Sequence, residues 1–296
     1  MFLSIYDSPA LAAYFVTVAA ALGLVMGSFL HCAAWRIVRG ESFLKGRSRC
    51  PQCGHTLTPA ELIPVASWLI QKGRCRNCNS PIPARYPLSE LGFAALTVLT
   101  LLRFDLTAVC LRNYVFICCL FCLTLTDLDD RIIPDGCHVI SALAWAVWAA
   151  ADFPGWAEVG LHVLSAFAFG GGILGISLVM DKVMDRDTLG GGDIKLVAVA
   201  GLYLGFVGTL FMLIIACIIG LAGSRFLQMP QRGSREAGQE ESGAGNSGNA
   251  PGQMCGREEA DQEGPGAFPF GPALAASTCF MLFCGGPLVR WYTGLL

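Results

Sequence analysis

Two aspartates at the borders of apolar segments are the residues of this chain best suited to carry out chemistry. Asp127 ends the uncharged run 113–126, and Asp193 follows three glycines in Gly190-Gly191-Gly192-Asp193. A carboxylate at a membrane edge is costly to place, so each marks a candidate functional site. If the two side chains meet, they hold one proton between them, because neighbouring carboxylates do not both ionise cheaply.

Such a pair has the chemistry of an aspartic protease that works at or within a bilayer. The ionised carboxylate activates water as a general base, while the protonated one polarises the scissile carbonyl and then protonates the leaving amine. The glycines before Asp193 leave room for a substrate backbone. The other acidic residues nearby have a simpler interpretation as charges of solvated turns: Asp129, Asp130, Asp135, Asp181, Asp185 and Asp187.

Four cysteines in a basic loop form a second set of chemically capable residues. They are arranged as Cys50-Pro51-Gln52-Cys53 and Cys75-Arg76-Asn77-Cys78. Two C-x-x-C pairs at this spacing are typical of a zinc ribbon, in which four thiolates hold tetrahedral Zn²⁺. The alternatives are redox dithiols or disulfides, which a reducing cytoplasm disfavours, and a ligand role for His55, for which a surface position is the simpler interpretation.

The composition indicates the elements that must position these residues. The chain has 296 residues, of which 54% are hydrophobic and 14% charged, and its mean hydropathy is +0.57. A soluble domain carries about 25% charged residues. We therefore expect an all-α polytopic membrane protein with about eight transmembrane helices and a small zinc-ribbon-like cytoplasmic loop domain. The expected spans are 10–30, 88–104, 107–126, 137–152, 159–181, 194–206, 208–226 and 269–290.

The stretch after Asp193 is the least regular of these segments. Its uncharged run 196–224 is longer than one span and shorter than two, since each span needs about 20 residues. Gly201, Gly205 and Gly208 allow a break, so we expect a short half-helix followed by a full helix.

The remaining boundaries follow from changes in composition. We expect a first transmembrane helix in 1–30, the four-cysteine loop domain in 31–87, the core with both aspartates in 88–229, a disordered polar insert in 230–266 and a last transmembrane helix in 267–296. Between His31 and Glu90, nine basic residues face three glutamates. The positive-inside rule therefore places this loop, and with it both aspartates, on the cytoplasmic side.

Several motifs occur together in the order and spacing of one enzyme family. They are Gly27-Ser28-Phe29-Leu30, Cys50-Pro51-Gln52-Cys53, Leu62-Ile63-Pro64-Val65-Ala66-Ser67-Trp68-Leu69, Gly73-Arg74-Cys75-Arg76-Asn77-Cys78, Arg85-Tyr86-Pro87-Leu88-Ser89-Glu90-Leu91, Asp127-Leu128-Asp129 with Ile133-Pro134-Asp135, Gly190-Gly191-Gly192-Asp193 and Pro269-Phe270-Gly271-Pro272. With these motifs the chain resembles the bacterial type IV prepilin peptidases, the bifunctional leader peptidases and N-methyltransferases of pilus and type II secretion systems. It departs from the family at His31, where asparagine is usual, and in the longer insert 230–266.

The resemblance implies an activity, its partners and its location. Such an enzyme sits in the bacterial inner membrane as a multi-pass protein and cleaves the basic leader of prepilins or pseudopilins on the cytoplasmic side. It then methylates the new N-terminal amine with S-adenosylmethionine. By resemblance, Asp127 and Asp193 are the catalytic aspartates. The expected cofactors are the methyl donor and a structural zinc at Cys50, Cys53, Cys75 and Cys78, and the expected partners are precursors and the lipid bilayer, without nucleic acid.

Two alternatives stay open at this point. One is a protease without methyl transfer, and the other is a carboxylate-based ion transporter with a zinc domain. The chain has no glycine-rich Rossmann fingerprint, so no methyl-donor site follows from the sequence. Glu90 is a candidate for orienting the amine, or simply a charge at the start of a helix.

Overall fold

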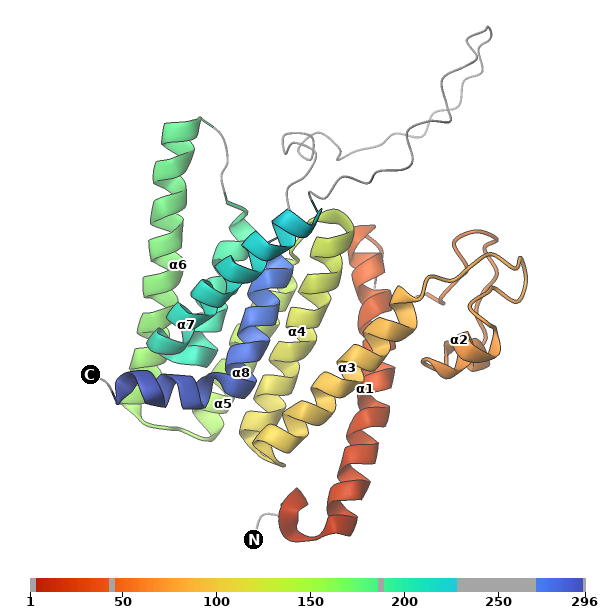
Figure 1. Cartoon of the computed structure of the whole chain (residues 1–296), viewed down its shortest axis with the longest axis horizontal. Helices are drawn as coiled ribbons and strands as arrows, with labels where there is room; N and C mark the ends of the chain where they lie inside the picture. The colour runs from red at the N-terminus through yellow and green to blue at the C-terminus, as the bar shows by residue number, and fades with distance from the viewer. Residues whose placement is uncertain (1–3, 43–45, 186–188, 228–269, 295–296) are drawn as a thin grey trace, which may run out of the picture.

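The computed structural model describes residues 4–42, 46–185, 189–227 and 270–294. Within these ranges the chain is almost entirely helical, as expected (Figure 1). Its long helices are α1 (Pro9–Val38), α3 (Arg85–Phe104), α4 (Ala108–Asp130), α5 (Asp135–Ala151), α6 (Trp156–Met184), α7 (Gly191–Leu227) and α8 (Gly271–Thr293). The short elements are η1 (Ile5–Asp7), η2 (Pro59–Leu62) and α2 (Ala66–Ile70). The polar insert predicted at 230–266 lies outside the described residues.

Six of the described helices are long and apolar enough to cross a membrane, namely α1, α3, α4, α6, α7 and α8. The chain is therefore a multi-pass membrane protein. Helix α5, with 17 residues, is shorter than these six and corresponds to the predicted span 137–152. The number of spanning helices is also lower than predicted because α7 contains both of the spans predicted after Asp193.

Helix α7 is broken at Gly205, one of the three glycines at which a break was predicted. Gly205 has φ 67° and ψ −177°, a backbone conformation that is essentially restricted to glycine. The first half of α7 runs antiparallel to α6. Gly201 lies against Ala166 and Gly205 lies against His162, so residue numbers rise along one helix as they fall along the other.

The second half of α7 returns toward the end of the bundle from which the first half came. Gly220 lies against Phe270 just before α8, whereas Phe211 packs on Tyr292 near the end of α8 with 5.7 Å between ring centroids. This half is therefore antiparallel to α8. The prediction of a half-helix followed by a full helix is confirmed, and the chain reverses its direction at Gly205.

Helix α1 extends further than predicted. It continues to Val38 rather than ending near residue 30, because His31, Ala34 and Arg36 in its last turns are buried. Gly23 permits close packing on α3, since a Cβ there would lie 2.6 Å from the Cα of Ala94.

Helix α4 lies at the centre of the core. Phe116, Ile117 and Leu120 are almost completely buried, in one cluster with Phe93 of α3 and Leu274 of α8. Lipid is as apolar as these side chains, so the helices associate through close van der Waals packing more than through removal of apolar surface from water. Small gaps at this centre would therefore reduce the van der Waals contact that holds the helices together.

The turn at Gly205 generates a stability prediction. Replacing Gly205 with Ala forces a Cβ into a glycine-only conformation, which costs about 1–3 kcal/mol. We expect Gly205→Ala to lower the melting temperature in detergent. Gly172→Ala is the matched control, because Gly172 lies in helical α6 with open space around its Cβ position. Equal melting temperatures for the two variants would contradict the reversal at Gly205.

Candidate active site

Asp127 lies on the last turn of α4, where the side chain is only 6% exposed. Arg131 ends the helix in the left-handed conformation, and its backbone N–H donates to the Asp127 carbonyl at 3.1 Å. The first residue of α8 packs directly on the carboxylate, because a Cβ built on Gly271 would lie 2.6 Å from Asp127 Oδ2. No larger residue than glycine fits at this point without displacing Asp127.

Asp193 lies on the first turn of α7 and is half-buried. Its backbone N–H donates to the Gly190 carbonyl at 3.0 Å, so the glycine run forms the turn that starts the helix. The adjacent Gly192 faces Ile133, because a Cβ added to Gly192 would lie 2.6 Å from the Cβ of Ile133. A helix N-terminus stabilises negative charge, which favours a carboxylate at this position.

The structure brings the two aspartates to the same end of the helix bundle. Ile133, in the turn that follows α4, covers the first turn of α7, and Lys195 on that turn pairs with Asp135 at 2.6 Å. One oxygen of each carboxylate is buried, Oδ2 of Asp127 and Oδ1 of Asp193. We refer to this end, with Asp127, Asp193 and Gly271, as the aspartate end.

The neighbouring acidic residues have the partners expected of turn charges. Asp129 accepts a hydrogen bond from Arg85 at 2.7 Å, which also fixes the start of α3 at the aspartate end. Asp135 is the exposed partner of Lys195. Asp129 lies in the last turn of α4 and Asp135 is the first residue of α5, so both lie at helix ends rather than in the predicted solvated turn.

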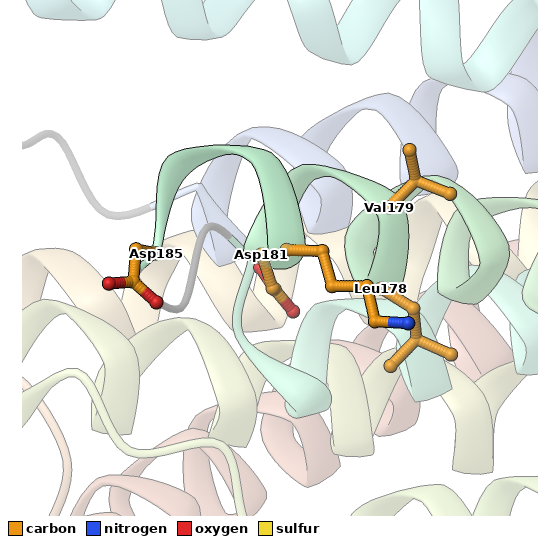
Figure 2. Close-up of a pocket in the computed structure, with 5 residues that line it drawn as sticks. Leu178, Val179, Asp181 and Asp185 are labelled. Carbon is orange, nitrogen blue, oxygen red and sulfur yellow. The ribbon is translucent and has the colours of Figure 1, made fainter.

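A hollow of about 500 Å³ lies at the carboxyl end of α6 (Figure 2). Four of its five lining residues come from that helix, and the fifth is Asp185, directly after it. Asp181, which was predicted in a solvated turn, therefore lies inside α6, whereas Asp185 follows its end. Neither Asp127 nor Asp193 lines it. We therefore do not assign the hollow to the site. Asp187, interpreted in the same way, lies outside the described residues.

The four cysteines of the loop domain converge as predicted. The sulfur atoms of Cys50, Cys53, Cys75 and Cys78 all lie within 4.8 Å of one another. Four sulfurs at Zn–S distances of about 2.3 Å around a tetrahedral ion are about 3.8 Å apart, so the cluster has the size of a zinc site. All thirteen cysteines among the described residues are free thiols, which argues against the disulfide alternative.

The two C-x-x-C pairs adopt the same backbone geometry. In the first pair, the Cys50 N–H donates to the His55 carbonyl, and the Cys50 carbonyl accepts from the Gly54 N–H, both at 2.9 Å. In the second pair, the Cys75 N–H donates to the Ser80 carbonyl, and the Cys75 carbonyl accepts from the Asn79 N–H, again at 2.9 Å. The fifth residue of each turn has positive φ, 70° at Gly54 and 59° at Asn79. Glycine and asparagine are the residues that tolerate this conformation. This repetition is a signal that the sequence contained and our sequence analysis missed.

The surroundings of Cys78 favour its thiolate form. Hydrogen bonds from the Ser80 side chain and backbone lower the pKa of Cys78 to about 6, and Asn77 Nδ2 donates to Cys53 Sγ at 3.5 Å. Thiolates are the form that binds zinc. His55 instead lies 3.5 Å from Glu61, which agrees with its interpretation as a residue outside the ligand set.

Glu90 connects the loop domain with the membrane helices. Its buried carboxylate accepts the backbone N–H of Val65 at 2.8 Å. Val65 has φ 60°, which is rare for a β-branched residue and is held here by that contact. The preceding residue on α3, Ser89, lies 2.9 Å from His31 Nδ1. No pattern in the sequence indicated these contacts, because they join residues from separate segments.

Comparison with known proteins identifies the family. The model for the bacterial peptidase A24 N-terminal domain matches residues 21–104, and that for the type IV leader peptidase family matches 114–224. The first range contains all four clustered cysteines, and the second contains both Asp127 and Asp193.

Proteins named prepilin leader peptidase/N-methyltransferase are similar over most of the chain. The protein of Myxococcus xanthus (strain DK1622) is 37% identical over 204 residues, 67% of this chain and 59% of the relative. The protein of Bacillus subtilis (strain 168) is 36% identical over 185 residues, which are 62% of this chain and 71% of the relative. The protein of Aeromonas hydrophila is 29% identical over 247 residues, which are 83% of this chain and 74% of the relative. No solved structure matches the chain. The chain belongs to the prepilin leader peptidase/N-methyltransferase family of membrane enzymes.

Proposed function

We propose that this protein is an aspartic endopeptidase that removes the leader of prepilins or pseudopilins and then methylates the new N-terminus with S-adenosylmethionine. The observation that carries the proposal is the placement of Asp127 and Asp193 at one end of the bundle, each with a buried carboxylate oxygen, inside the segment that matches the leader peptidase family. The basic loop domain lies at that same end, which supports a cytoplasmic site in the inner membrane.

The helix ends support different roles for the two carboxylates. Asp193 sits at the positive N-terminus of α7, which stabilises its ionised form, whereas Asp127 sits at the negative C-terminus of α4, which disfavours a second charge. On this basis we assign Asp193 as the general base and Asp127 as the general acid.

In the proposed reaction, Asp193 takes a proton from the attacking water as its oxygen bonds to the scissile carbonyl carbon. Asp127 polarises the carbonyl oxygen and delivers its proton to the leaving amine as the C–N bond breaks. The pair then again holds a single proton, now on Asp193. The close packing of Gly271 on Asp127 holds this side chain in one position throughout.

The four cysteines would hold a zinc ion, with a structural role. Their separation and their Ser80 and Asn77 hydrogen bonds fit four thiolates around one ion. When bound, the ion would crosslink the two C-x-x-C turns, and the contact of Glu90 with Val65 would transmit this order to α3. No step of the cleavage uses the ion.

The first prediction from this proposal concerns peptide cleavage. Asp127→Asn and Asp193→Asn are each expected to reduce cleavage of a precursor by about 10³-fold or more, because neither variant retains the acid–base pair. Asp185→Asn is the matched control. Asp185 is an exposed carboxylate at the left-handed end of α6, where asparagine is tolerated, and it lies outside the proposed site. Cleavage retained in either of the first two variants, measured by a gel shift of the precursor, rules out the pair.

The second prediction concerns the metal. The purified protein is expected to contain about one zinc ion per chain by elemental analysis, and Cys53→Ser with Cys78→Ser is expected to abolish binding. Cys217→Ser should leave zinc unchanged, because Cys217 is exposed on α7, far along the sequence from the cluster. A zinc-free wild-type protein that contains Cys50–Cys75 or Cys53–Cys78 disulfides would refute the assignment.

The third prediction separates the two activities. A co-expressed pseudopilin should lose its leader and gain the mass of one methyl group at its new N-terminus, as read by mass spectrometry. A cleaved but unmethylated N-terminus would leave the endopeptidase and refute the methyltransferase, which is a result of particular interest here because His31 replaces the usual asparagine.

A further inference from the structure

The loop domain between α1 and α3 exposes apolar side chains that the helix bundle does not cover. Leu62 and Ile63 are 42% and 52% exposed, and Leu69 and Ile70 are 62% and 70% exposed. Within residues 46–84, all of which the structure describes, these four are the only large apolar side chains with such exposure. We refer to them as the α2 patch. A concentration of exposed apolar side chains marks a surface that contacts a partner or a membrane.

We propose that the α2 patch inserts into the lipid interface of the leaflet at the aspartate end, and that the basic residues beside it bind anionic headgroups. The partner is thus a negatively charged lipid surface. Such a contact attaches the loop domain to the bilayer in addition to the spanning helices. It is independent of both proposed activities, so it can fail while they stand.

The position of α2 makes lipid its nearest partner. The Val65 N–H, directly before α2, donates to Glu90 near the start of α3 at 2.8 Å, so α2 is attached beside a spanning helix. Arg85 at that start pairs with Asp129 near the end of α4, and such charged groups mark the edge of the hydrocarbon region. In Figure 1, in which the aspartate end is at the top, α2 lies lower than the start of α3 and beside the helices. The patch therefore lies at the depth of the headgroups and the upper acyl chains.

The backbone keeps the patch next to basic residues. Directly after α2, the Lys72 N–H donates to the Leu69 carbonyl at 3.1 Å, and the Gly73 N–H donates to the Trp68 carbonyl at 2.9 Å. Gly73 has φ 67° and packs on the Trp68 ring, since a Cβ there would lie 2.9 Å from Trp68 Cζ2. The chain thus turns sharply at Lys72, so the basic segment that continues with Arg74 begins beside the patch.

The exposed charge of the loop domain is entirely positive. Its exposed cations form no ion pair with another described residue. They are Arg47, Arg49, Lys72, Arg74 and Arg76. The only carboxylate within residues 46–84 is that of Glu61, which is buried and accepts the Thr58 N–H at 2.8 Å. An anionic lipid surface attracts such a set of cations.

The depth of the patch favours lipid over a protein partner. An acidic protein in the aqueous phase would match the cations, but it would reach α2 only by displacing the lipid that surrounds the spanning helices at that level. Lipid matches both halves of the surface at once, because headgroup phosphates face the cations and acyl chains face the apolar side chains.

Depth-dependent quenching tests the position of the patch. A fluorescent amino acid replaces Ile70 in the full-length protein, which is placed as a single copy in nanodiscs that contain phosphatidylglycerol. The same amino acid in place of Ser42, exposed just beyond the end of α1, is the control. We expect a spin label on the upper acyl chain to quench residue 70 at least about threefold more than residue 42, and iodide in the water to show the opposite order.

Equal quenching of the two positions by the labelled lipid, or free access of iodide to residue 70, would overturn the proposal. The patch would then face water and be left for a soluble protein partner. A single copy in each nanodisc ensures that a second molecule of this chain does not shield residue 70.

Charge variants test the headgroup contact. Lys72→Gln with Arg74→Gln and Arg76→Gln should reduce lipid quenching at residue 70 by about twofold or more, as should nanodiscs of phosphatidylcholine alone, because the electrostatic attraction is lost. Arg290→Gln, which removes an exposed cation near the end of α8, is the control and should change nothing. Exposed charges contribute little to folding, so melting temperatures in detergent should match the wild type. Quenching that responds neither to the three substitutions nor to the lipid charge would overturn the assignment of anionic headgroups.

Discussion

Contacts at two glycines determine how closely the helices of the aspartate end approach each other. A Cβ on Gly271 would lie 2.6 Å from Asp127 Oδ2, and a Cβ on Gly192 would lie 2.6 Å from Ile133 Cβ. Each contact joins the start of one helix to the end region of α4. Without them, α7 and α8 would stand further from α4, and Asp127 would be neither buried nor fixed.

The reversal at Gly205 has a consequence for the same end of the molecule. Because the second half of α7 returns, Gly220 comes to lie against Phe270, directly before Gly271. The glycine-only conformation in the middle of α7 therefore helps to support the residue that packs on Asp127. In lipid, where an unpaired backbone group is costly, such a break is tolerated only inside the protein, and the packing of Gly205 on His162 provides that setting.

The sequence predicted those features that a single segment determines. The bilayer requires long apolar helices, so hydropathy located them, and the glycines in the overlong run 196–224 indicated the break. Cysteine spacing predicted the metal cluster because both partners of each turn lie within a few residues. The extension of α1 to Val38, the contact of Glu90 with Val65 and that of Gly271 with Asp127 could not be predicted in this way. They depend on pairs of residues from different segments, and neither periodicity nor composition contains that information.

In the proposed mechanism, the fold also accounts for the different roles of two identical side chains. In the proposed mechanism, a charge at a helix terminus changes in free energy by about 0.3–1 kcal/mol, favourably for Asp193 and unfavourably for Asp127. The two effects add, because moving the proton from one aspartate to the other reverses both of them. Together they favour the proposed arrangement, with the proton on Asp127 and the charge on Asp193, by about 3- to 30-fold. In this proposal, repulsion between the two carboxylates retains one proton, and the helix directions favour Asp127 as its position. An aspartic site can thus obtain its acid and its base from the orientation of α4 and α7, without a third residue to distinguish them.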